Sequence, residues 1–142
     1  LSDTLNSNTV RKEILENQLS DLKQQPRWVD GSGLSRYNLF TPTSFVQVLT
    51  KLYTEIPRER LFSFFPAGGK HGTFKDWYAG NPEPYIYAKS GTLGNNYSLS
   101  GYIVTKSNKI LIFSFMNNHF TTSTNDVKHK MQSIFEFLRD KY

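Results

Sequence analysis

The second half of the chain carries three strand-like segments in a row, and this pattern limits the fold more than any other. The segments cover residues 85–93, 98–105 and 110–116 and are rich in β-branched and aromatic residues. Gly94-Asn95-Asn96 separates the first two, and Ser107-Asn108-Lys109 separates the last two, as is typical of β-hairpins. The sequence therefore predicts an antiparallel meander of three strands in this half of the chain.

Helical patterns precede the predicted meander. Apolar residues recur at helical spacing over residues 9–23, and Pro26 ends this pattern. Thr41 followed by Pro42 predicts the start of a second helix, because a hydroxyl cap before a proline is typical of helix N-termini. Pro57 opens a short third helix. The first half of the chain is therefore predicted to be helical, with loops between the helices.

A last helix is expected after the third strand. Thr124 and Asn125 are candidate caps at its start. Because helices come first, a meander follows and a final helix covers it, the fold class is α+β, an antiparallel sheet meander with flanking helices. The apolar face of the last helix consists of Val127, Met131, Ile134, Phe135 and Leu138.

Composition supports a folded domain and narrows the function classes. Aromatic residues make up 15% of the 142 residues, which argues against disorder. There is no cysteine, so disulfides and cysteine-based metal sites are excluded, and the three histidines form no metal-binding motif. No apolar run reaches the ~18–20 residues that a membrane span needs, and no signal-peptide pattern opens the chain. The cysteine and histidine content therefore gives no indication of a metal site.

The net charge of +5 suits a polyanionic partner such as nucleic acid, anionic lipid or an anionic cell-wall polymer. The basic residues are scattered along the chain, and no run of five like charges occurs. A nucleic-acid-binding domain would be expected to cluster them on one face, so this scatter counts against nucleic acid as the partner.

One chemistry-bearing motif lies on the first predicted strand. Lys89, Ser90 and Gly91 place a fixed positive charge, a hydroxyl and a bare backbone position next to one another. A hydroxyl can donate to a carboxylate, and a strand bare at glycine lets an extended peptide pair along its edge. A lone Lys-Ser-Gly triplet is also compatible with an ordinary strand end.

The second motif is Asp30-Gly31-Ser32-Gly33-Leu34-Ser35-Arg36-Tyr37-Asn38. Part of it is a glycine-rich turn, in which Asp30 is expected to accept from local N–H groups. Arg36 carries a planar fork that binds carboxylates with two hydrogen bonds. The alternative for Arg36 is an ion pair with Asp30 or another acidic residue of the chain.

Together these motifs make the chain resemble the C-terminal part of a class C low-molecular-mass penicillin-binding protein, a D-alanyl-D-alanine carboxypeptidase/endopeptidase. The family has Lys-Thr-Gly where this chain has Lys89-Ser90-Gly91, so the hydroxyl is kept and the methyl is lost. The resemblance implies the C-terminal part of a β-lactamase/transpeptidase-like fold. Residues 1–142 would be the C-terminal portion of the penicillin-binding domain, with the N-terminal half and its nucleophile outside this chain.

The resemblance also implies site residues. On the strand, Lys89 would supply charge, Ser90 would bind the terminal carboxylate of the substrate, and the N–H of Thr92 would be an oxyanion-hole donor. Around it, loop 30–38 would border the cleft and hold the substrate side chain. The implied catalytic residues are Lys89, Ser90, Gly91 and Thr92, and the implied substrate-binding residues are Ser32, Gly33, Leu34, Arg36 and Leu93.

Two short motifs imitate the missing elements of this family. Ser20-Asp21-Leu22-Lys23 matches Ser-x-x-Lys, but it stands near a predicted helix end, whereas the nucleophile should open a buried helix. Ser123-Thr124-Asn125 matches Ser-x-Asn, but it follows the Lys-Ser-Gly strand instead of preceding it. We interpret the first as part of a helix end and not as a catalytic site, and the second as a helix cap.

The function implied by the resemblance is serine-type cleavage of acyl-D-Ala-D-Ala in peptidoglycan stem peptides, through an acyl-enzyme that β-lactam antibiotics also form. The resemblance implies that this reaction needs no metal and no organic cofactor. The expected location is the periplasm or the outer cell surface, with a signal peptide upstream of this chain. The 142 residues alone are expected to be inactive. A non-catalytic peptidoglycan-binding module is one alternative, and a basic nucleic-acid-binding domain is a second.

The resemblance has a consequence for the third predicted strand. In the resembled fold, strand 110–116 would be central and would pair on its far side with a strand of the N-terminal half. Without that strand, an apolar and uncharged edge would be exposed, and such edges pair with other chains. A homodimer of the isolated chain is therefore expected.

Overall fold

An antiparallel sheet organises the computed structural model, which describes residues 6–142. Its strands are β1 (Ile86–Thr92), β2 (Tyr97–Val104) and β3 (Ile110–Asn117), hydrogen-bonded in the order β1-β2-β3. In this register Lys89 lies opposite Ser100, which lies opposite Ser114. The predicted meander is confirmed, and each predicted strand agrees with the structure to within one residue at both ends.

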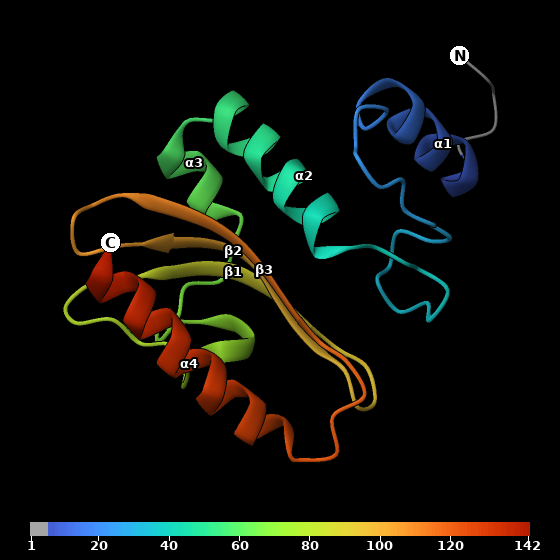
Figure 1. The fold of residues 1–142 in the computed structure, drawn as a ribbon. Helices are drawn as coiled ribbons and strands as arrows, with labels where there is room; N and C mark the ends of the chain where they lie inside the picture. Colours follow the sequence, from blue (N-terminus) through green and yellow to red (C-terminus); the bar gives the residue numbers. More distant parts are fainter. Residues whose placement is uncertain (1–5) are drawn as a thin grey trace.

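Helices cover both faces of the sheet (Figure 1). Helix α4 (Thr124–Lys141) crosses one face, and α2 (Pro42–Glu55) with the short α3 (Arg58–Ser63) covers the other. Helix α1 (Ser7–Asn17) lies beyond the sheet, next to the loop that leads into α2. The α+β prediction is confirmed. None of the helices in the described residues combines the length and the apolar character needed to cross a membrane.

The larger core lies between the sheet and α4. The ring of Phe135 on α4 is its centre, 4.8 Å from the ring of Phe113 and 5.6 Å from that of Tyr78. Gly101 on β2 allows β2 to approach β1 closely, because a Cβ at this position would collide with the carbonyl of Tyr87 and with Ala88 on β1. Other buried members of this core are Phe74, Tyr85, Ile86, Tyr97, Leu99, Ile103, Val127 and Met131.

The second core lies under α2 and α3. Tyr102 is fully buried there, and its hydroxyl donates to the carbonyl of Leu49 at 2.8 Å. Removal from water raises the pKa of the Tyr102 phenol to about 12, so it remains a neutral donor. Phe62 of α3 stacks on Tyr87 of β1 with 4.3 Å between ring centroids. This contact fixes α3 over the first half of β1.

The first helix is shorter than predicted. The apolar pattern predicted a helix over 9–23, but α1 ends at Asn17 and turns follow it. The side-chain amide of Gln25 donates to the carbonyls of Leu19 and Ser20, which stabilises these turns in place of further helix. The prediction was wrong here because the apolar residues after Asn17 belong to turns.

The predicted start of α2 is confirmed, and the predicted cap of α4 is corrected. Thr41 caps α2 by accepting from the N–H of Ser44 at 3.1 Å, with Pro42 as the first helical residue. The cap of α4 is Ser123, one residue before the predicted Thr124 and Asn125. Ser123 and Asp126 accept from each other's backbone N–H groups at 3.1 Å, a reciprocal capping box.

The two outer edges of the sheet differ. A short segment, 66–68, pairs with the outer edge of β1: Gly68 N–H donates to Ile86 O at 3.0 Å, and Ala88 N–H donates to Pro66 O at 3.1 Å. The segment does not continue past Ala88. At the opposite edge, β3 pairs with β2 alone among the strands of residues 6–142.

Candidate active site

The second half of β1 has an open outer edge. Backbone groups alternate in direction along an antiparallel strand, and Tyr85 O accepts from Val104 N–H of β2. Every second residue from Tyr85 therefore faces β2, whereas Ser90 and Thr92 direct their N–H and C=O groups outward. Within the described part of the chain, no hydrogen bond engages the Thr92 N–H. An extended peptide could therefore pair here with Ser90 and Thr92, although the Ser90 carbonyl also accepts from the Lys89 ammonium.

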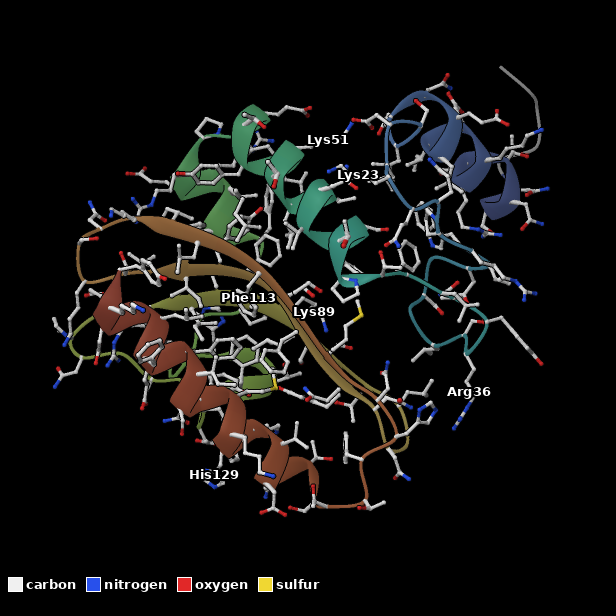
Figure 2. All side chains as sticks on the ribbon, in the orientation of Figure 1. Lys23, Arg36, Lys51, Lys89, Phe113 and His129 are labelled. Carbon is white, nitrogen blue, oxygen red and sulfur yellow. The ribbon has the colours of Figure 1, made fainter. Side chains whose placement is uncertain are left out.

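Lys89 and Ser90 flank this open edge on opposite faces of the sheet. Side chains alternate along a strand, so Lys89 shares the face of Tyr87 and α2, and Ser90 shares the face of Ala88 and α4. The Lys89 ammonium is exposed and donates to the Ser90 carbonyl at 2.7 Å (Figure 2). Among residues 6–142, no carboxylate lies within 4.0 Å of it. Its positive charge is available to a ligand.

The Ser90 hydroxyl meets a residue that the sequence interpretation missed. Its Oγ lies 2.6 Å from Oγ1 of Thr73, in the short helix η1 (Gly72–Phe74). The only signal in the sequence is that Thr73 ends a glycine-rich loop. In the structure Gly72 adopts a positive φ of 78°, a conformation that favours glycine. Spacing along the chain gives no indication that this loop folds back onto β1.

The loop 30–38 is fixed by its own polar groups. Asp30 Oδ1 accepts from the Ser32 N–H at 2.7 Å and from the Ser32 hydroxyl, and these hydrogen bonds lower the pKa of Asp30. The side-chain oxygen of Asn38 accepts from the N–H groups of Val29 and Asp30 at 2.8 and 3.1 Å. The predicted role of Asp30 as a local acceptor is confirmed.

Arg36 extends from this loop toward the hairpin end of the sheet (Figure 2). Its Nη2 lies 3.7 Å from the position that a Cβ on Gly94 would occupy, in the turn after β1. In the described residues it has no carboxylate within 4.0 Å, so the alternative of an ion pair with Asp30 is not observed. A second free positive charge therefore lies at the end of the open strand.

The other predicted binding residues make no hydrogen bond to the open edge of β1 in the described part of the chain. Ser32, Gly33 and Leu34 form the tip of loop 30–38, where the Leu34 side chain is 78% exposed. No hydrogen bond in the described part of the chain joins these three residues to β1. Leu93 is half-buried and donates its N–H to Asn96 O at 3.1 Å, which closes the turn after β1. Its part in binding stays a prediction.

Both imitating motifs have structural roles. Ser20 and Lys23 lie in the turns after α1, and Asp21 between them pairs with Lys51 of α2 at 2.6 Å. Lys23 is thus not held one helical turn from Ser20. The Ser123-Thr124-Asn125 motif caps α4, as interpreted from the sequence, although the capping residue is Ser123.

Residues 6–141 match the family model described as the D-Ala-D-Ala carboxypeptidase 3 (S13) family. The chain belongs to the S13 family. A penicillin-sensitive carboxypeptidase A from Dictyostelium discoideum is 30% identical over 70% of this chain. The D-alanyl-D-alanine carboxypeptidase DacB from Haemophilus influenzae is 29% identical over 80% of it. The chain spans only 20% and 24% of the length of these two relatives. The resemblance inferred from the two motifs is confirmed.

Solved structures show the same fold. Penicillin-binding protein 4 from Haemophilus influenzae superimposes with a TM-score of 0.77 at 24% identity, over 94% of this chain and 31% of that one. The Bd0816 predatory endopeptidase from Bdellovibrio bacteriovorus, solved with its immunity protein, gives 0.74 at 19% identity, over 96% and 37%. The predicted likeness to the C-terminal part of a DD-peptidase fold is therefore confirmed.

Proposed function

We propose that this chain supplies the Lys89-Ser90-Gly91 strand, which lines one side of the active site in a serine-type DD-peptidase that acts on peptidoglycan stem peptides. The observation that carries the proposal is the open edge of β1. Lys89 and Ser90 flank this edge, and the Thr92 N–H points outward from it, in a chain of the S13 carboxypeptidase family. Names of the relatives support the substrate class, since both are carboxypeptidases and one is called penicillin-sensitive.

Three residues of β1 have distinct roles in the proposed reaction. The acyl part of the stem peptide pairs along the open edge, and the Ser90 hydroxyl donates to the terminal carboxylate. The Lys89 ammonium stabilises negative charge beside the reacting groups. The Thr92 N–H donates to the carbonyl oxygen of the scissile bond as charge develops on it.

The nucleophile would be a serine outside these 142 residues. Its hydroxyl oxygen attacks the carbonyl carbon, the C–N bond breaks, and the terminal D-Ala leaves with the proton on its amine. Water then hydrolyses the ester and restores the serine. A β-lactam would acylate the same serine. Because peptidoglycan lies outside the cytoplasm, the protein would work in the periplasm or at the outer cell surface.

The proposal is tested on the complete protein by its rate of acylation with a fluorescent penicillin. Lys89→Ala should lower this rate roughly 100- to 1000-fold, as the loss of a preorganised electrostatic group does. Lys109→Ala is the matched control, because Lys109 is also exposed but lies in the turn before β3. Equal rates for both variants would contradict the assigned role. A complete protein that binds peptidoglycan but is never acylated would instead be a non-catalytic binding module.

A further inference from the structure

A second hydroxyl stands beside Ser90 at the open edge of β1. The Oγ1 atom of Thr73 and the Oγ atom of Ser90 are 2.6 Å apart, a short hydrogen bond in which either can donate. Thr73 is exposed and Ser90 is half-buried. The pair is therefore part of the surface that a bound peptide would contact.

The position of Thr73 is fixed by its neighbours on both sides. Gly72 packs so closely on Pro66 that a Cβ at Gly72 would lie 2.8 Å from the Pro66 Cβ. Pro66 is itself held to β1, because its carbonyl accepts from the Ala88 N–H. On the other side, Phe74 is fully buried in the core under α4. An exposed hydroxyl is thus held at a constant position relative to β1.

The hydrogen bond decides where the Ser90 proton points. Serine has no second group on Cβ to restrict χ1, and its hydroxyl has one proton and two lone pairs. If Ser90 donated to Thr73, its only proton would be unavailable to an anion. If Thr73 donates to Ser90, the Ser90 proton is directed away from Thr73 and its next hydrogen bond is strengthened by polarisation.

We propose that Thr73 is a positioning residue that donates to Ser90 and so directs the Ser90 hydroxyl toward the carboxylate of the substrate. Thr73 acts through Ser90. This inference rests on the proposed function, because it requires Ser90 to bind that carboxylate.

The test compares acylation of the complete protein by a penicillin and by the methyl ester of the same penicillin, which lacks the free carboxylate. Thr73→Val removes the hydroxyl and keeps the shape of the side chain. It should lower the acylation rate for the acid roughly 10-fold, as expected for a hydrogen bond that supports binding of a charged group. The rate for the ester should change less than about 2-fold. Thr73→Ser restores the hydroxyl and should bring back most of the rate for the acid.

A double-mutant cycle with Ser90→Ala shows whether Thr73 acts through Ser90. In the Ser90→Ala background, Thr73→Val should have no further effect. Equal losses on acid and ester, or the same loss with and without Ser90, would overturn the inference while leaving the proposed function intact. A wild-type protein that penicillin does not acylate would overturn the proposed function, and this inference with it. Thr73→Ala replaces Thr73→Val if the valine variant does not fold.

Discussion

The Nη2 atom of Arg36 lies 3.7 Å from the point where a side chain on Gly94 would begin. Arg36 therefore brings loop 30–38 next to the turn after β1, three residues beyond the Lys-Ser-Gly motif. A side chain at position 94 would be in van der Waals contact with the guanidinium. The arrangement leaves one positive charge at each end of the open edge, Lys89 at one and Arg36 at the other.

Arg36 is predicted to select substrates with a free side-chain carboxylate. In the complete enzyme, Arg36→Ala should reduce kcat/KM roughly 10-fold for stem peptides that carry such a carboxylate, the loss of one charge-assisted pair at an exposed site. Turnover of a minimal acyl-D-Ala-D-Ala should change little. Arg27→Ala is the control, because Arg27 is exposed near the same loop and lies over the ring of Tyr37. Equal losses on both substrates would remove Arg36 from the binding site.

Ser20 is predicted not to be a nucleophile. The isolated 142-residue chain, incubated with a fluorescent penicillin, should keep its unmodified mass, because Ser20 lies in a turn and has no lysine one helical turn away. Intact-mass spectrometry is the measurement. A stoichiometric adduct that disappears in Ser20→Ala would show that the chain carries its own nucleophile.

The isolated chain is predicted to dimerise along β3. All eight residues of this strand are half-buried, and its outer edge is unpaired within residues 6–142. Alternation directs the Ile112 N–H to that edge, so Ile112→Pro should shift the dimer toward monomer without removing a hydrogen bond to β2. Ile112→Val keeps the N–H and is the control. Light scattering after size-exclusion chromatography should give about twice the chain mass for the wild type and for Ile112→Val.

Either of two results would contradict this dimer. One is a wild-type monomer at high concentration, and the other is an Ile112→Pro variant that stays dimeric. Phe113 is unsuitable for the test, although it is adjacent on the strand. Its ring packs 4.8 Å from Phe135, so a charged residue there would disrupt the core under α4 (Figure 2).

The cap of α4 is predicted to make stability depend on pH. Hydrogen bonds from Ser123 lower the pKa of Asp126 below its ordinary 3.8 in the folded chain. The ionised Asp126 therefore stabilises the fold fully at pH values above its unfolded pKa of 3.8. This stabilisation is lost as the pH falls through the lower pKa of the folded chain. Ser123→Ala should reduce the free energy of unfolding by about 1 kcal/mol at pH 7, and by less at about pH 2–3.

Urea unfolding at both pH values measures this difference. Ser133→Ala is the matched control, because Ser133 is exposed on the same helix and donates to the carbonyl of His129. The effect of Ser133→Ala on the free energy of unfolding should be the same at both pH values. If the gap between wild type and Ser123→Ala did not narrow in acid, the ionised Asp126 would have no part in the cap.

Local patterns in the sequence predicted the sheet well, and long-range contacts were beyond them. The strands follow from alternation and turn residues, which act between near neighbours. The first helix was overextended, because the donation from Gln25 to the carbonyls of Leu19 and Ser20 leaves no trace in apolar spacing. Lys89 and Arg36 were found through the family resemblance. Thr73 was missed, since its contact with Ser90 spans 17 positions and depends on how the glycine-rich loop folds back.

The pairing of segment 66–68 with β1 limits how many residues of a bound peptide can pair with the outer edge of β1. A strand advances about 3.3 Å per residue, so the free stretch from Ser90 to Thr92 is roughly 10 Å long at most. A bound peptide can exchange backbone hydrogen bonds with those two residues and then meets Pro66, which already occupies the Ala88 N–H. The bound peptide therefore cannot continue to pair with β1 beyond Ser90 in the direction of Ala88. It accommodates the end of a peptide more readily than a continuous stretch.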